Sequence, residues 1–236
     1  MRRLLLISNS TMHGRGYLDH AEEEIRSFLG GPARIVFIPY ALHDQDGHAA
    51  RARERLLAMG CQVAPVHEAV RDGRAAGAFD RCDAIFVGGG NTFRLLDSLH
   101  RLALVDLIRG RVERGIPYIG SSAGSIVAGP TLKTTKDMPI VQPPTFEALG
   151  LVPFQISPHY LDPDPGSTHM GETQEERIFQ YLEENTARVV GLREGSMLRV
   201  EGAAATLRGC APARIFERGA TPIEVPTGAC LDHLLR

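Results

Sequence analysis

Residues 118–125 read YIGSSAGS, and this stretch contains the pattern Gly-x-Ser-x-Gly with Ser122 at its centre. A strand-like run precedes the pattern, and residues 125–128 after it are compatible with a helix. A serine at such a strand-to-helix turn is held exposed at the top of a sheet, and small flanking residues permit the strained backbone. The helix start also supplies N–H groups where an oxyanion would form. We therefore predict a nucleophilic Ser122; the alternative is a glycine-rich connection without chemistry.

The chain before this turn alternates short apolar runs with longer helical patterns. Such alternation is typical of a parallel sheet wound by crossover helices, whose ligands bind beyond the carboxyl ends of the strands. We predict an α/β fold with a doubly wound, mostly parallel open sheet. The predicted strands are Arg3–Ile7, Arg34–Pro39, Gln62–Val66, Asp83–Val87 and Ile116–Ile119, and the predicted helices are Leu18–Leu29, His48–Met59, Thr92–Leu99 and Leu102–Arg114.

The pattern changes after Gly129-Pro130, where proline-rich loops run as far as a helical pattern at Glu172–Glu184. Short apolar runs then predict a small antiparallel C-terminal extension that closes the sheet. These runs are Val189–Leu192, Met197–Val200, Ala203–Leu207, Ala213–Phe216 and Ile223–Val225. No repeat or flexible linker interrupts the chain, so we expect residues 1–236 to form a single α/β domain.

Composition excludes several classes of partner. The 26 basic and 28 acidic residues nearly cancel and form no basic stripe, which argues against nucleic acid. The four cysteines have no paired metal-ligand spacing, so we expect them to be reduced. The apolar run Leu4–Ile7 ends at Ser8 and is too short for a signal peptide or a membrane span. A cytoplasmic protein without a membrane partner is the expectation.

A second glycine-rich stretch, Gly88-Gly89-Gly90, lies at a predicted strand end and just before a helix. Its uncovered N–H groups could stabilise an oxyanion, together with the N–H of Ala123. A phosphate-binding loop would need a nearby lysine and hydroxyl, or a longer glycine spacing, and neither is present. We predict oxyanion binding by Gly89 and Gly90; a plain tight turn is the alternative.

A catalytic serine requires a base, and the context of the histidines favours His159. An apolar run ends at Pro158 directly before it, whereas His169, the nearest rival, lies in a polar loop. The carboxylate that orients the imidazole is less defined by the residues. Asp137 lies in a loop between serine and histidine, and Glu194 follows a later strand. We slightly favour Asp137 and keep Glu194 as the alternative third member.

Taken together, several motifs resemble the aspartyl dipeptidases of the S51 serine peptidase family. The matching stretches are collinear over nearly the whole chain: residues 6–11, 87–92, 120–124, 137–141, 157–160 and 171–173. The resemblance implies a flavodoxin-like fold related to class I glutamine amidotransferases, with serine in place of their cysteine. It also implies hydrolysis of dipeptides with an N-terminal aspartate, with Ser122 as nucleophile, His159 as base and Asp137 as third member.

The chain departs from the family pattern at two positions. Ser121 stands where an aromatic residue often precedes the nucleophile, and Gln174 stands where an arginine directly follows Gly-Glu-Thr. The third member also varies, since cyanophycinase-like relatives use a glutamate, which keeps Glu194 and an altered specificity open. The candidate substrate-binding residues are Asn91, Lys136, Glu172 and Arg177.

The predicted reaction is an acyl-enzyme cycle of a serine-type dipeptidase, which requires no metal and no organic cofactor. The expected partner is a small peptide substrate, and a homodimer is compatible with the sequence. Two other functions are considered. An α/β-hydrolase-type esterase shares the serine motif, but the short interval between Ser122 and His159 disfavours it. A non-catalytic nucleotide- or metabolite-binding module would use Gly88–Gly90 instead.

Overall fold

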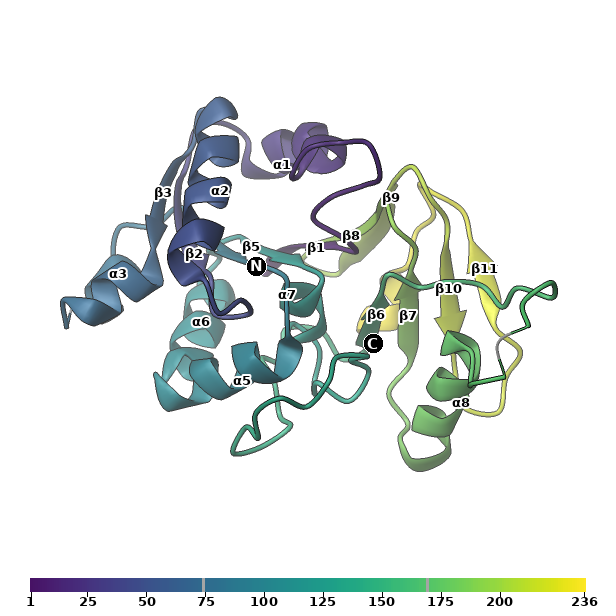
Figure 1. The fold of residues 1–236 in the computed structure, drawn as a ribbon. Coiled ribbons are helices and arrows are strands. Elements are labelled where there is room, and N and C mark those ends of the chain that lie inside the picture. Colours follow the sequence, from purple (N-terminus) through teal and green to yellow (C-terminus); the bar gives the residue numbers. More distant parts are fainter. Residues whose placement is uncertain (74, 169) are drawn as a thin grey trace.

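The computed structural model describes residues 1–73, 75–168 and 170–236, and it contains two sheets (Figure 1). The first sheet has the strand order β3-β2-β4-β5-β1-β8-β9. Its strands are β1 (Arg3–Ile7), β2 (Arg34–Ile38), β3 (Gln62–Pro65), β4 (Ala84–Val87), β5 (Tyr118–Ser121), β8 (Ser196–Glu201) and β9 (Ala204–Gly209). The five strands from β3 to β1 are mutually parallel, and β8 and β9 join the edge antiparallel. The predicted mostly parallel, doubly wound sheet is confirmed.

The two faces of this sheet bury different residues of each strand. In β1, Leu4 and Leu6 belong to one core cluster, whereas Leu5 and Ile7 belong to another. Side chains alternate across a strand, so an uninterrupted apolar run must be covered on both faces. One cluster includes Ile25 of α1 (Glu22–Leu29) and Leu56 of α2 (Gln45–Ala58), and the other includes apolar residues of α5 (Thr92–Arg101) and α6 (Leu104–Glu113). The continuous apolar strands thus explain why helices lie on both sides.

Three of the helices begin at a residue whose side chain accepts a hydrogen bond from a free N–H group of the first turn. The α-helices are α1 (Glu22–Leu29), α2 (Gln45–Ala58), α3 (Val66–Arg71), α4 (Ala75–Ala78), α5 (Thr92–Arg101), α6 (Leu104–Glu113), α7 (Ala123–Ile126) and α8 (Gln174–Glu184), and two short 3₁₀ turns are η1 (Asp19–Ala21) and η2 (Asp232–Leu235). Asp44 caps α2, Asn91 caps α5, and Thr173 forms a capping box with Glu176 at α8. These caps set the starts of α2, α5 and α8.

Several element boundaries differ from the predicted ones for local reasons. The strand expected at Ile116–Ile119 begins at Tyr118, because Pro117 has no N–H to donate to the ladder. The helix expected from Leu18 begins with η1, since Leu18 has a left-handed backbone with φ of 59°. Ala103, with φ of 53°, likewise delays α6 to Leu104. The short helices α3 and α4 were not predicted.

The C-terminal part of the chain corrects one expectation. Only β8 and β9 extend the first sheet, whereas β6 (Gln155–Pro158), β7 (Val189–Leu192), β10 (Ala213–Phe216) and β11 (Ile223–Val225) form a second sheet in the order β11-β10-β7-β6. Helix α8 lies beside this sheet (Figure 1). Its apolar residues Ile178 and Leu182 pack with Val189 and Phe216. The second sheet also shares a core cluster with the first sheet, which includes Ile156 and Leu4.

The pairing of β6 with β7 is parallel, with Pro158 opposite Leu192. The carboxyl ends of parallel neighbours meet at the same edge of a sheet, so the residues that follow β6 and β7 must lie close together. His159 follows the first strand and Glu194 follows the second. Helix α7 packs against both β5 and β6, which brings this edge to the turn that carries Ser122.

Candidate active site

Ser122 occupies the tight turn between β5 and α7 with a φ of 52° and a ψ of −109°. This conformation is rare for a residue with a side chain, and such strain concentrates at functional sites. Its N–H donates to the Ile7 carbonyl at 3.0 Å, which holds the turn against β1. The flanking glycines are required by close packing: a Cβ at Gly120 would lie 2.5 Å from the Gly124 oxygen, and one at Gly124 would lie 2.1 Å from the Val87 oxygen.

His159 lies beside this serine, with 3.0 Å between Nε2 and Ser122 Oγ. On the opposite side of the ring, Nδ1 lies 2.7 Å from Oε1 of Glu194. A carboxylate can only accept a hydrogen bond, so in the neutral ring Nδ1 carries the proton and Nε2 has the free lone pair. Nε2 therefore accepts the Ser122 hydroxyl proton. The geometry forms one continuous chain of hydrogen bonds from Ser122 through His159 to Glu194.

Asp137 does not contact His159, contrary to the preference derived from the sequence. Its Oδ2 accepts hydrogen bonds from the Thr92 N–H at 2.7 Å, the Thr92 hydroxyl at 2.6 Å and the Thr135 hydroxyl at 3.0 Å. Thr92 is the first residue of α5, where a negative charge is favourable. The acid next to the imidazole is the alternative, Glu194, because the parallel pairing of β6 and β7 places it there.

The glycine-rich stretch after β4 lies against Ser122. A Cβ built on Gly89 would lie 3.0 Å from Ser122 Cβ and 3.7 Å from Ser122 Oγ. Gly88 and Asn91 donate their N–H groups to Ile38 and Ala41, whereas those of Gly89 and Gly90 have no protein acceptor within the described part of the chain. Ala123 opens α7, so its N–H has no partner inside the helix. Of the three predicted oxyanion donors, Gly89 thus lies against Ser122 and Ala123 follows it in the chain, whereas a Cβ on Gly90 would meet Ala41 and Leu42 instead.

The four candidate substrate-binding residues differ in their existing contacts. Asn91 is engaged on both sides, since Oδ1 caps α5 and Nδ2 donates to the Met138 carbonyl at 2.9 Å. Lys136 Nζ donates to three protein oxygens, which are the carbonyls of Pro158 and His159 and the side-chain oxygen of Gln174. Arg177 has only a 3.9 Å ion pair with Glu172 among the residues described, and both side chains are more than half exposed. Arg177 is therefore the cation with donors available to a ligand.

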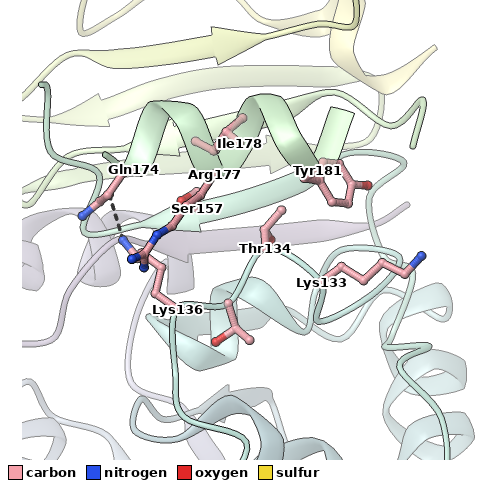
Figure 2. A pocket seen from close by; sticks show the side chains of 9 residues that line it. Lys133, Thr134, Lys136, Ser157, Gln174, Arg177, Ile178 and Tyr181 are labelled. Atoms are coloured by element: carbon pink, nitrogen blue, oxygen red, sulfur yellow. Dashed lines mark hydrogen bonds between the residues drawn. The ribbon is translucent and has the colours of Figure 1, made fainter. Parts of the chain in front are cut away.

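Lys136 and Arg177 line the same pocket, together with Gln174 at the start of α8 (Figure 2). Part of the Lys136 side chain reaches solvent, but protein atoms crowd its ammonium group. This desolvation lowers the pKa of Lys136 to about 8; the nearby Arg177 charge also lowers it, whereas the charges of Asp137 and Glu194 oppose the shift.

Two residues that contact the site were missed by reasoning from the residues. Ser8 and Asn9 follow β1 and are buried. Ser8 Oγ accepts the N–H of His159 at 2.9 Å, and Asn9 Oδ1 accepts the N–H of Gly195 at 2.8 Å, beside Glu194. A polar pair at the carboxyl end of a central parallel strand was the available signal. His169, the rival histidine, lies outside the described residues.

No helix in the residues described has the length and apolarity needed to cross a membrane. Within the same ranges, no group of three or more His, Cys, Asp or Glu side chains is arranged to hold a metal ion. Cys61 and Cys82 are buried, Cys210 and Cys230 are exposed, and all four are free thiols.

A serine at a strained strand-to-helix turn, a histidine with a carboxylate partner, and N–H groups facing the serine are the arrangement of a serine hydrolase. The model of peptidase family S51 matches residues 4–208. Over 98% of this chain and 94% of its own length, a peptidase E of Streptomyces coelicolor is 56% identical. A probable alpha-aspartyl dipeptidase of Drosophila melanogaster is 45% identical over 100% of this chain and 98% of its own length. The chain belongs to peptidase family S51.

Two solved structures share the fold. A putative peptidase E protein from Listeria monocytogenes EGD-e has a TM-score of 0.69 at 23% identity, covering 89% of this chain and 100% of its own. A peptidase from an acI-B1 Actinobacterium has a TM-score of 0.71 at 15% identity, covering 98% and 96%. The α/β architecture expected from the sequence is thus that of solved peptidases.

Proposed function

We propose that this peptidase is a serine dipeptidase that cleaves dipeptides with an N-terminal aspartate through an acyl-enzyme on Ser122. The observation that carries the proposal is the hydrogen-bond chain from Ser122 Oγ through His159 to Glu194. The names of the relatives from Streptomyces coelicolor and Drosophila melanogaster support the dipeptidase activity, and the second name supports the aspartyl specificity.

Acylation begins when Ser122 Oγ attacks the peptide carbonyl carbon while His159 Nε2 accepts the hydroxyl proton. Glu194 then lies against an imidazolium and stabilises its positive charge. The carbonyl oxygen becomes an oxyanion that accepts hydrogen bonds from Ala123 and from Gly89 or Gly90. As the tetrahedral intermediate collapses, His159 protonates the leaving amine and the C–N bond breaks. The aspartyl group remains esterified to Ser122.

Deacylation follows the same route with water as the nucleophile. His159, neutral again, takes a proton from the water as its oxygen attacks the ester carbonyl. The same N–H groups stabilise the second oxyanion, and His159 returns the proton to Ser122 Oγ as free aspartate leaves. Every proton transfer in this cycle passes through Nε2, which is why the orientation of the ring matters in both halves.

Recognition of aspartate requires a cation for the side-chain carboxylate and an anion for the free ammonium. Arg177 is our choice for the cation, because its guanidinium has only the distant partner Glu172, whereas the hydrogens of Lys136 are committed to protein oxygens. Glu194 is engaged with His159, so Glu172 is the proposed partner of the ammonium. Glu172 and Arg177 would then exchange their long ion pair for contacts with the substrate.

The test compares hydrolysis of Asp-Leu with that of a short-chain aryl ester, in the wild type and in Ser122→Ala. We expect turnover of Asp-Leu, little turnover of the ester, and a loss on the order of a millionfold in the variant. Preferred hydrolysis of the ester would favour the α/β-hydrolase-type esterase instead. Wild-type turnover by Ser122→Ala would exclude Ser122 as the nucleophile, and absence of turnover of either substrate would favour a binding module.

A further inference from the structure

The backbone of His159 has a conformation that is costly for a residue with a side chain. Its φ is 51°, in the left-handed region, and it directly follows the last residue of β6. Left-handed backbone in non-glycine residues persists only where surrounding contacts hold it. On one side, the buried Ser8 hydroxyl accepts the His159 N–H at 2.9 Å and donates to the Leu192 carbonyl at 2.8 Å. This contact fixes the N–H side of the turn to β7.

Lys136 holds the carbonyl side of the same turn. Its Nζ donates to the Pro158 carbonyl at 2.7 Å and to the His159 carbonyl at 3.1 Å, so it bridges the peptide groups before and after the histidine Cα. The third hydrogen bond goes to Gln174 Oε1 at 3.0 Å (Figure 2). A protonated lysine has three hydrogens, and all three are engaged here.

The segment that carries Lys136 is itself anchored at both ends. Thr134 donates its hydroxyl to the Ile156 carbonyl of β6 at 2.9 Å. Asp137 binds the start of α5, just beyond the glycine-rich stretch that faces Ser122. The segment therefore spans from the strand that carries the base to the helix that begins behind the oxyanion donors, and Lys136 cannot move far from His159.

We propose that Lys136 is a positioning residue whose ammonium group fixes the left-handed turn at His159 and so directs Nε2 at Ser122. This inference rests on the proposed function, because it assigns a role relative to the catalytic base. It also separates Lys136 from substrate recognition, which falls to Arg177. Without Lys136, the carbonyls of Pro158 and His159 each lose a hydrogen bond, and the imidazole samples orientations in which Nε2 does not meet the serine.

The role of the ammonium predicts a dependence on pH. A neutral amine has two hydrogens and a lone pair, so it can satisfy only two of the three oxygens and repels the third. The charged or titratable groups near this ammonium are Asp137 on its own segment, Arg177 on α8, Glu194 after β7 and His159 after β6. Since crowding lowers the pKa of Lys136 to about 8, the contact weakens as the pH rises through that value.

The test measures how fast Ser122 reacts with an uncharged fluorophosphonate, because this reaction requires the base but no recognition of a substrate carboxylate. Lys136→Met should slow labelling by at least about tenfold, the scale of a small misplacement of a catalytic group. Lys136→Arg should recover part of the rate, since a guanidinium also donates to two carbonyls. Lys133→Met is the matched control: Lys133 lines the same pocket but donates to Asn185 Oδ1, so its rate should stay within about twofold.

The pH profile supplies a second readout on the unmodified chain. The labelling rate of the wild type should decline above about pH 8, and Lys136→Met should lack this decline. Equal labelling of Lys136→Met and the wild type, with loss of Asp-Leu hydrolysis alone, would make Lys136 a substrate-binding residue and overturn the proposal. A wild-type profile without a decline between about pH 8 and 9.5 would overturn it even if the variant does not fold. A wild type that is not labelled at all would refute the proposed function, and the inference with it.

Discussion

Replacement of Glu194 by Gln tests whether Glu194 or Asp137 is the carboxylate that orients His159. Glu194 Oε1 accepts the Nδ1 proton at 2.7 Å, whereas a glutamine can turn its NH₂ group toward Nδ1. The ring would then carry its proton on Nε2, which faces Ser122 and could no longer act as a base. Even with the amide oxygen toward Nδ1, the imidazolium formed during acylation would lose a stabilising negative charge.

The size of the effect depends on the exposure of the pair. Loss of a buried orienting carboxylate costs about ten-thousandfold in rate. The Glu194 side chain is 47% exposed, so water can replace part of its role. We expect kcat for Asp-Leu to fall about a thousandfold in Glu194→Gln, or about 4 kcal/mol in the activation free energy. The melting temperature should change little, because the pair is accessible to solvent.

Asp137→Asn is the matched comparison, and the expected result is the opposite combination. Three donors converge on Asp137 Oδ2, and an amide cannot satisfy them all. We expect the free energy of unfolding to fall by about 2 kcal/mol and the activity by about ten- to a hundredfold, through displacement of the glycine-rich stretch. Steady-state kinetics and thermal melts of both variants decide the matter. A larger rate loss in Asp137→Asn, with an unchanged melting temperature, would refute this reasoning and restore Asp137 as the orienting acid.

Three further outcomes are expected. Gly89→Ala places a Cβ 3.0 Å from Ser122 Cβ and should lower kcat about a hundredfold. Gly110→Ala in α6 is the control and should keep full activity, because a Cβ there would approach nothing closer than 3.6 Å. Equal kinetics of the two variants would contradict the placement of Gly89. Arg177→Met should reduce kcat/KM for Asp-Leu about ten- to a hundredfold, because the aspartate carboxylate loses its cation. The slow hydrolysis of Asn-Leu should not change, and an equal loss on both substrates would argue against carboxylate recognition by Arg177. Chemical denaturation should give one transition by fluorescence and circular dichroism, because both sheets contribute to one core cluster; two separated transitions would contradict a single domain.

Much of the fold could be read from local pattern. The apolar runs that became β1, β2 and β4 are buried on both faces, and only a sheet covered by helices on both sides accommodates such strands. The turn at Ser122 was also predictable, because the glycines at 120 and 124 leave room that no other residue permits between β5, α7 and β4. These features depend on residues close together in the chain.

The second sheet and the partner of His159 depended on pairing over long distances in the chain. The C-terminal runs had strand character, but their alternation could not show that β7 pairs parallel with β6 while β8 pairs antiparallel with β1. That choice decides which acid meets the imidazole. Asp137 is 22 residues before His159 and Glu194 is 35 after it, and neither separation carries spatial information. The sequence by itself thus determined the parallel sheet that presents Ser122, and it singled out His159 as the histidine that lies beside this serine. Only the tertiary structure decided that Glu194 lies beside the His159 imidazole while Asp137 binds the start of α5, because strand pairing is a property of the whole chain.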